Sequence, residues 1–187
     1  MSMEVWSLAA SVGTLLVIAA TAIAAMIQLR HMRSSNQITA LSKLEEIWDD
    51  PEFRAKRRRV TDGLDERLRD PAFRAELEKD TTTDSFAQDV VELTNFFEGM
   101  GIYAKHGLAD PNVIFDFWSA IIVGSWRRLA PAIAIMRRTS GPMLCENFQY
   151  LAAIAQRFNE AHPNGSVPKG AALAPLEDVW LKDDHPV

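Results

Sequence analysis

A stretch in the middle of the chain gathers side chains that enzymes use for catalysis. It covers residues 95–108 and reads NFFEGMGIYAKHGL. Glu98 and His106 are of the types that serve as general acids and bases. Gly99 and Gly101 match the first two glycines of the phosphate-binding pattern G-x-G-x-x-G, but the third glycine is missing. The question is whether this stretch catalyses a reaction or only packs and ends a helix.

The rest of the sequence offers these side chains no catalytic partner. The four histidines are scattered without an H-x-x-x-H pair, and His106 has no serine or cysteine at a recognisable spacing. Cys145 is the single cysteine, so no internal disulfide can form, and no Cys/His cluster has the spacing of a metal site. We therefore expect no catalytic residue, cofactor or metal, and we interpret the stretch as a packing segment.

Length and composition describe an ordinary folded protein. The chain has 187 residues, about the length of one domain, and 24% of them are charged while 48% are hydrophobic. Its net charge is -5. Because general nucleic-acid binders are normally basic, this charge argues against nucleic acid as a partner.

Residues 1–33 are predicted to form a transmembrane anchor. No charged residue occurs between Val5 and Leu29, and about 20 apolar residues suffice for a spanning helix. A cleaved signal peptide is the alternative, but it would open with basic residues, and Glu4 is the only charged side chain before the segment. We therefore expect the anchor to be retained.

The charges that flank the anchor predict its orientation. Arg30, His31 and Arg33 follow it directly, and no lysine or arginine precedes it. The positive-inside rule then places the N-terminus outside and the rest of the chain in the cytoplasm. We expect a single-pass membrane protein, with the lipid bilayer as one partner.

Residues 34–80 are predicted to form a charged helical stalk or hairpin. Apolar residues recur at helical spacing up to Trp48, so we expect the anchor helix to continue to Asp49. The hexapeptides DPEFRA and DPAFRA, at residues 50–55 and 70–75, read as two helix starts because Asp caps helices and Pro fits their first position.

Residues 56–59, KRRR, form the one cationic cluster of this segment. The nearby acids, together with Phe53, Val60 and Leu64 at helical spacing, favour the solvated face of a helix. Contact with anionic lipid headgroups is the alternative.

Residues 81–162 are predicted to form a helical bundle, which makes the fold all-α. The first helix begins at the TTTD motif of residues 81–84 and ends at Gly107, which suits a left-handed C-terminal position. Its apolar stripe consists of Phe86, Val90, Leu93, Phe97, Met100 and Ala104.

Two further long helices complete the predicted bundle. One begins at Asp110-Pro111 and is broken or kinked by Pro131. The other begins at residues 140–142 and ends near His162. Their apolar stripes are Ile114, Phe117, Trp118, Ile121, Ile122, Ser125 and Leu129, and then Leu144, Phe148, Leu151, Ala155 and Phe158.

Residues 163–187 are predicted to be a mostly irregular tail, since they are rich in Pro, Gly and Ala. A short apolar patch occurs in it, formed by Leu176, Val179, Trp180 and Leu181. We expect this patch to dock on the bundle, and the alternative is a peptide that binds a partner.

The chain resembles a bacterial family of small proteins with one N-terminal membrane span and a cytoplasmic helical domain of unknown function. The resemblance lies in Phe96-Phe97-Glu98, Trp126-x-x-Leu129-x-Pro131, Arg137-Arg138 and the run ENFQYL at residues 146–151. It implies a location in the bacterial inner membrane and an all-helical cytoplasmic domain, and it brings no assigned catalytic residues.

Residues 95–108 then have a structural interpretation. Phe97 is expected to face the core, and Gly99 and Gly101 to let a neighbouring helix approach closely, at a cost of about 1 kcal/mol each in helix stability. Glu98 is expected to pair with an arginine on a neighbouring helix. The candidate structural or interaction residues are Phe97, Glu98, Trp126, Arg127, Arg128 and Arg138, with Arg137 as a further partner for Glu98.

These features predict a membrane-anchored helical adaptor or accessory protein that acts by binding another protein, and not an enzyme. An alternative is an effector that acts on the membrane as a homo-oligomer, joined through the small residues Ala9, Gly13, Ala20 and Ala24 of its span. An unrecognised hydrolase is the least favoured alternative.

Overall fold

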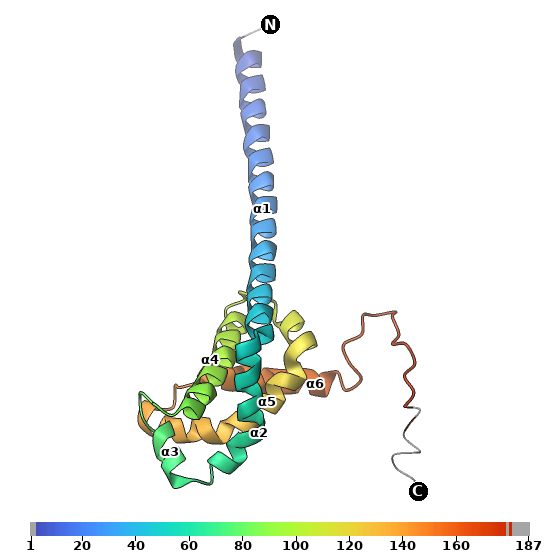
Figure 1. Ribbon diagram of the computed structural model, residues 1–187. Helices are drawn as coiled ribbons and strands as arrows, with labels where there is room; N and C mark the ends of the chain where they lie inside the picture. Colours follow the sequence, from blue (N-terminus) through green and yellow to red (C-terminus); the bar gives the residue numbers. More distant parts are fainter. Residues whose placement is uncertain (1–2, 179, 181–187) are drawn as a thin grey trace.

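The computed structural model describes residues 3–178 and 180, and within them the fold consists of helices with no strand (Figure 1). This confirms the all-α prediction. The helices are α1 (Met3–Asp49), α2 (Pro51–Arg67), α3 (Pro71–Leu77), α4 (Ser85–Lys105), α5 (Pro111–Ser140) and α6 (Glu146–Ala161).

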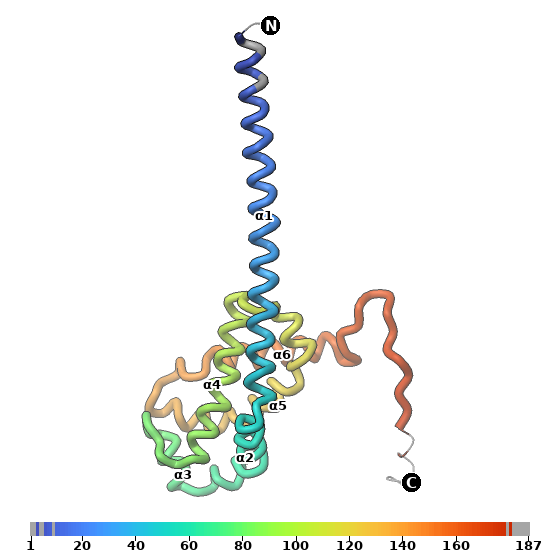
Figure 2. The backbone as a smooth tube through the Cα atoms, turned by 45° about the horizontal axis from the view of Figure 1, so that its top comes forward, coloured from blue at the N-terminus to red at the C-terminus, as the bar shows by residue number. Residues whose placement is uncertain are grey.

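Helix α1 is one continuous helix of 47 residues, as the periodicity up to Trp48 predicted. Its N-terminal part stands clear of the other helices, and only its C-terminal end packs among them (Figures 1 and 2). Leu44 is buried there. The aromatic ring of Trp48 meets that of Trp118 on α5 edge-on, with 4.7 Å between the ring centroids. Ala40 and Leu41 also pack against the core, so the long helix is fixed to the bundle by its C-terminal end.

Both α1 and α5 are long and apolar enough to be candidate membrane spans. They differ in burial. Much of the apolar part of α5 lies inside the protein, whereas none of the apolar part of α1 does. Helix α5 is therefore the core helix of the bundle, and α1 is the candidate span.

Aspartate caps begin four of the helices, as their positions in the sequence predicted. Asp50, Asp70 and Asp110 each precede a proline at the first helical position, and each accepts a hydrogen bond from a backbone N–H in the first turn. Asp84 accepts two such bonds at the start of α4. Gly107 follows α4 with a positive φ of 65°, which confirms it as a left-handed residue.

One hydrophobic core joins the bundle to the helices that precede it. Helices α4 and α5 both pack against α6, while α2 packs against α4 and α3 against α5. The segment predicted as a stalk contributes six buried apolar side chains to this core, namely Leu44, Phe53, Val60, Leu64, Phe73 and Leu77. The boundary expected at residue 80 therefore does not separate two cores.

The predictions for the later helices hold in part. Pro131 lies inside α5, which continues from Pro111 to Ser140 with its two halves running in different directions, so of the two expected outcomes the helix shows a kink and not a break (Figure 1). The last helix begins at Glu146 and not at residues 140–142, because Gly141 and Cys145 both have positive φ and the residues between them form a turn. Phe117, expected in the stripe of α5, is 64% exposed.

The tail leads away from the bundle in its described part (Figure 1). Leu176 is 99% exposed and Trp180 is 66% exposed, so the prediction that these side chains dock on the bundle is wrong. Val179 and Leu181, the other members of the apolar patch, lie outside the described residues.

Candidate functional site

The stretch at residues 95–108 is mostly the C-terminal half of α4, and its apolar side chains face the core. Phe97 is fully buried and stacks on Phe148 of α6, with 4.7 Å between ring centroids and 12° between ring planes. Met100 and Ala104, one and two turns further on, are also buried. The packing interpretation of this face is confirmed.

Helices α4 and α6 approach each other closely at Gly101. A Cβ atom built on Gly101 would lie 2.3 Å from the carbonyl oxygen of Asn147 and 2.6 Å from its carbonyl carbon. No side chain fits there, because the contact is with backbone. The same test finds no atom within 4 Å at Gly99, so the expected close approach is confirmed for Gly101 and wrong for Gly99.

Glu98 caps α6 and does not pair with an arginine. Its two carboxylate oxygens accept hydrogen bonds from Asn147 Nδ2 and from the backbone N–H of Phe148, both at 2.7 Å. The first N–H groups of a helix have no partner within the helix. Cys145, which precedes α6 with a left-handed φ of 56°, provides no side-chain cap. A side chain from α4 therefore does the work of the missing cap.

The arginines expected to meet Glu98 lie elsewhere. Arg138 pairs with Glu78, next to α3, at 2.7 Å. Arg137 donates to the carbonyl oxygen of Leu144 at 2.8 Å and to the side chain of Gln149 at 2.9 Å. These two contacts hold the turn before α6 in place. The predicted ion pair of Glu98 is wrong because the unsatisfied N-terminus of α6 lies closer to it.

Trp126 and Arg127 line a small cavity of about 200 Å³ between α5 and α6. The Trp126 ring meets Phe148 edge-on at 5.1 Å, which ties this wall to the core. Gln149 and Gln156 add uncharged polar groups to the lining. Arg128, the next residue along α5, lines a different and larger cavity.

That larger cavity has a volume of about 370 Å³ and lies where the end of α1 meets α2, α4 and α5. Its buried apolar lining includes Leu93 and Leu129. Its charged lining consists of four arginines, Arg54, Arg57, Arg58 and Arg128, and no carboxylate of the described residues lines it. We call this cavity the arginine pocket.

The four arginines differ in what already holds them. Arg54 lies 3.5 Å from the carboxylate of Asp49. The guanidinium of Arg57 lies over the ring of Trp48, 3.5 Å from its centroid. Burial lowers the pKa of Arg57, and the nearby charge of Arg54 lowers it further. Among the described side chains, Arg58 and Arg128 have no carboxylate within ion-pair distance.

The KRRR cluster is divided by the geometry of α2. Lys56 bridges Glu52 at 2.9 Å and Glu92 at 2.8 Å, and Arg59 pairs with the buried Asp89 at 2.8 Å. These two residues therefore tie α2 to α4. Arg57 and Arg58 point instead to the arginine pocket, together with Arg54.

Sequence reasoning missed the arginine pocket although a signal for it exists. Positions 54, 57 and 58 are spaced i, i+3 and i+4, which places them on one face of a helix. The run of four basic residues at 56–59 draws attention to neighbours in the sequence, which lie on different faces of a helix. Arg128 comes from a distant helix, and no local pattern relates it to the other three.

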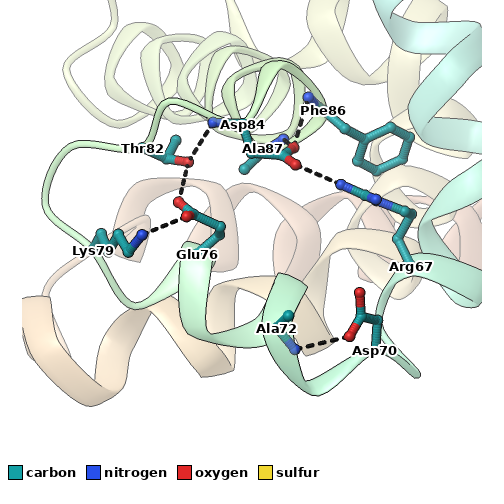
Figure 3. Close-up of polar contacts among 9 residues, drawn as sticks. All are labelled: Arg67, Asp70, Ala72, Glu76, Lys79, Thr82, Asp84, Phe86 and Ala87. Atoms are coloured by element: carbon teal, nitrogen blue, oxygen red, sulfur yellow. Dashed lines mark hydrogen bonds and ion pairs between the residues drawn. The ribbon is translucent and has the colours of Figure 1, made fainter.

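A polar network links α3 to the start of α4 (Figure 3). Asp84 accepts hydrogen bonds of 2.9 Å from the backbone N–H groups of Phe86 and Ala87 and pairs with Arg67 at 2.6 Å. The Thr82 hydroxyl donates to Glu76 and accepts from the backbone N–H of Asp84. The hydrogen bond from Ala87 is the main reason why the pKa of Asp84 is lowered. This network fixes the start of α4.

Comparison with known proteins places the chain in a family. The model of that family, described as a domain of unknown function (DUF4760), matches residues 15–155. The chain belongs to the DUF4760 family. The DUF4760 match begins within the apolar part of α1 and ends in α6, so it includes the arginine pocket and excludes the tail. No curated protein and no solved structure matches the chain.

Proposed function

We propose that this DUF4760 protein is a single-pass protein of the bacterial inner membrane, with its N-terminus outside and its bundle in the cytoplasm. We further propose that it acts as an adaptor or accessory subunit by binding another protein. The observation that carries the proposal is the exposed apolar part of α1, which is long enough to cross a bilayer. In water such a surface would be unfavourable, since each buried square ångström of apolar area is worth about 25 cal/mol.

The basic residues next to the span support the proposed orientation. Arg30 and Arg33 follow the apolar part directly on the same continuous helix. The chain has no lysine or arginine before residue 30. Basic residues favour the cytoplasmic side of the membrane.

The topology is tested with reporters on the full-length chain. A reporter active only in the cytoplasm and one active only in the periplasm are fused in turn after Val187. We expect activity from the cytoplasmic fusion alone, and the protein in membranes that have been washed at high pH. Activity of the periplasmic fusion alone would refute the orientation, and recovery in the soluble fraction would refute the anchor.

The exposed tail supports partner binding. Leu176 and Trp180 are large apolar side chains that the bundle does not cover, and aromatic residues are frequent anchors of protein interfaces. Crosslinking in intact cells tests this role. A crosslinked species that disappears in a Leu176→Ser, Trp180→Ser double variant, but persists in a Val167→Ser control, is the expected result. Equal crosslinking by all three proteins would refute a role of these residues.

The alternative function is a membrane effector that oligomerises through α1. Gly13 has no atom within 4 Å of a Cβ built on it, so this face of the span is open to a second helix. The mass of the protein in mild detergent decides between the two. A monomer would leave the adaptor, and an oligomer that Gly13→Leu dissociates would favour the effector.

A further inference from the structure

We propose that the arginine pocket binds a small phosphorylated molecule, with Arg58 and Arg128 as the residues that hold its phosphate. The pocket is defined by four arginines around a cavity of about 370 Å³. This inference goes beyond the proposed function, which requires no small-molecule ligand.

The charged side chains that line the pocket are all positive. Four guanidinium groups line one cavity. Of these four arginines, only Arg54 lies within ion-pair distance of a carboxylate of the described residues. Like charges that share a site repel one another, and an anion between them removes that repulsion. Every arginine stays protonated in a protein, so the repulsion cannot be relieved by loss of a proton.

One wall of the pocket is held in place by contacts within the protein. Arg57 is held over the ring of Trp48, and its side chain also donates to the Trp48 carbonyl oxygen at 3.5 Å. Trp48 in turn packs against Trp118 and Phe96 in the core. This wall is therefore fixed by the fold. Arg58 and Arg128 extend from the exposed surfaces of α2 and α5, where they are available to a ligand.

The lining has hydrogen-bond donors that suit a phosphate group. Guanidinium groups offer paired N–H donors that fit the oxygens of a phosphate group in a bidentate manner. Thr61 and Ser125 add hydroxyl groups to the same lining. The volume lies at the lower end of the range of small-molecule sites. A phosphorylated metabolite fits these features better than a bare phosphate ion, which would leave much of the cavity unfilled.

Lipid headgroups carry the same chemistry but lie at the wrong height. Trp48 lies about 28 Å further along α1 than Leu29, at a rise of 1.5 Å per residue. The headgroup region of a leaflet is only about 5–8 Å thick. The pocket therefore faces the solution beyond the headgroups, so we assign it to a soluble ligand. This step alone rests on the proposed membrane anchor.

Gly124 offers a way to close the pocket without disturbing the fold. It lines the cavity, and a Cβ built on it meets no atom within 4 Å. Gly99 on α4 has the same open surroundings but does not line the pocket. Leucine at residue 124 would fill the cavity, whereas leucine at residue 99 adds the same side chain elsewhere.

The test measures binding of inorganic pyrophosphate to the full-length protein in a mild uncharged detergent, by isothermal titration calorimetry at low salt. We expect saturable binding with one site per chain. Arg58→Gln and Arg128→Gln should each weaken it about tenfold or more, as expected for the loss of one charge-assisted contact. Arg127→Gln, which removes the same charge one residue away, should change the affinity less than twofold. Gly124→Leu should abolish binding, and Gly99→Leu should retain it.

A second arm replaces pyrophosphate with phosphatidic acid in the same detergent micelles. Binding of phosphatidic acid without binding of pyrophosphate would overturn the assignment to a soluble ligand. Absence of pyrophosphate binding at millimolar concentration, or equal losses in the Arg127 and Arg128 variants, would overturn the site itself. None of these results depends on the reporter fusions that test topology, so the two proposals can fail separately.

Discussion

Glu98 on α4 accepts a 2.7 Å hydrogen bond from the backbone N–H of Phe148, and so caps a helix that begins 48 residues later in the sequence at Glu146 without a side-chain cap of its own. The neighbouring residues of α4 serve the same contact, since Phe97 stacks on Phe148 and Gly101 touches the backbone of Asn147. The stretch that resembled an active site is the packing surface for α6.

Gly101→Ala should destabilise the protein by about 1–3 kcal/mol, the usual cost of overpacking. Its new methyl group would meet the carbonyl of Asn147, which cannot rotate away as a side chain could. Urea denaturation of the full-length protein in detergent, followed by tryptophan fluorescence, measures the change. The control is Gly99→Ala, which should stabilise the protein by up to about 1 kcal/mol because alanine favours helix and the space is open. Equal effects at the two positions would contradict the close contact.

Phe97→Ala should cost about 3–5 kcal/mol, the range for removing a buried phenylalanine. The side chain is fully buried and stacks on Phe148. Phe117→Ala removes the same atoms from an exposed position and should change stability by no more than about 0.5 kcal/mol. The same denaturation assay compares them. A Phe97 variant as stable as the Phe117 variant would refute the packing assignment.

Asp84→Ala should destabilise the protein by about 1–2 kcal/mol at neutral pH, since it removes the cap of α4. Asp84→Asn keeps an acceptor for the cap and should cost less. The pKa of Asp84 is lowered from its ordinary value of 3.8 in the folded state, mainly by the hydrogen bond from Ala87. Its charge therefore contributes stability above pH 3.8 that is lost as the pH falls further.

Urea denaturation across the acidic range follows this charge contribution. The difference in unfolding free energy between the natural protein and the Asp84→Asn variant should be constant above the ordinary pKa and shrink below it. A difference that grows on acidification would show that the pKa of Asp84 is not lowered.

The Cys145 thiol should react slowly with iodoacetamide in the folded protein, because it is buried and its pKa is raised above 9.0. Burial is the main cause, and the negative charge of Glu98 adds to it. Glu98→Gln should therefore lower the pKa of the thiol and shift the pH dependence of alkylation downwards. Mass spectrometry measures the modified fraction against time, with the urea-unfolded protein as the reference for free reaction. Equal rates in the folded and unfolded protein would contradict the burial.

Local signals predicted the helices well. Asp at four helix starts, three of them followed by Pro, fixed the N-termini of α2 to α5, because caps act on N–H groups two or three residues away. Gly107 predicted the end of α4 because glycine readily adopts the positive φ at which helices end. The start of α6 was misplaced, since residues 140–142 resemble a helix start while the cap of α6 comes from α4 and not from the residue before the helix.

Contacts between helices were harder to predict. Gly99 and Gly101 look equivalent in sequence, and only the position of α6 shows that one is crowded and the other open. The arginine pocket needs Arg128 of α5 to meet the arginine face of α2, which depends on how the helices pack. Periodicity shows which face a helix buries, but it does not show which helix lies opposite.

The unbroken course of α1 sets the direction in which the bundle faces around the axis of α1. No loop separates the apolar part of α1 from Leu44 and Trp48, which are held among the bundle helices. Each residue of an α-helix turns the chain by about 100°. One residue inserted between the two parts of α1 would therefore rotate the arginine pocket by about that angle relative to the apolar part of α1. The number of residues in this segment therefore determines the direction in which the pocket faces, as well as its distance from the apolar part of α1.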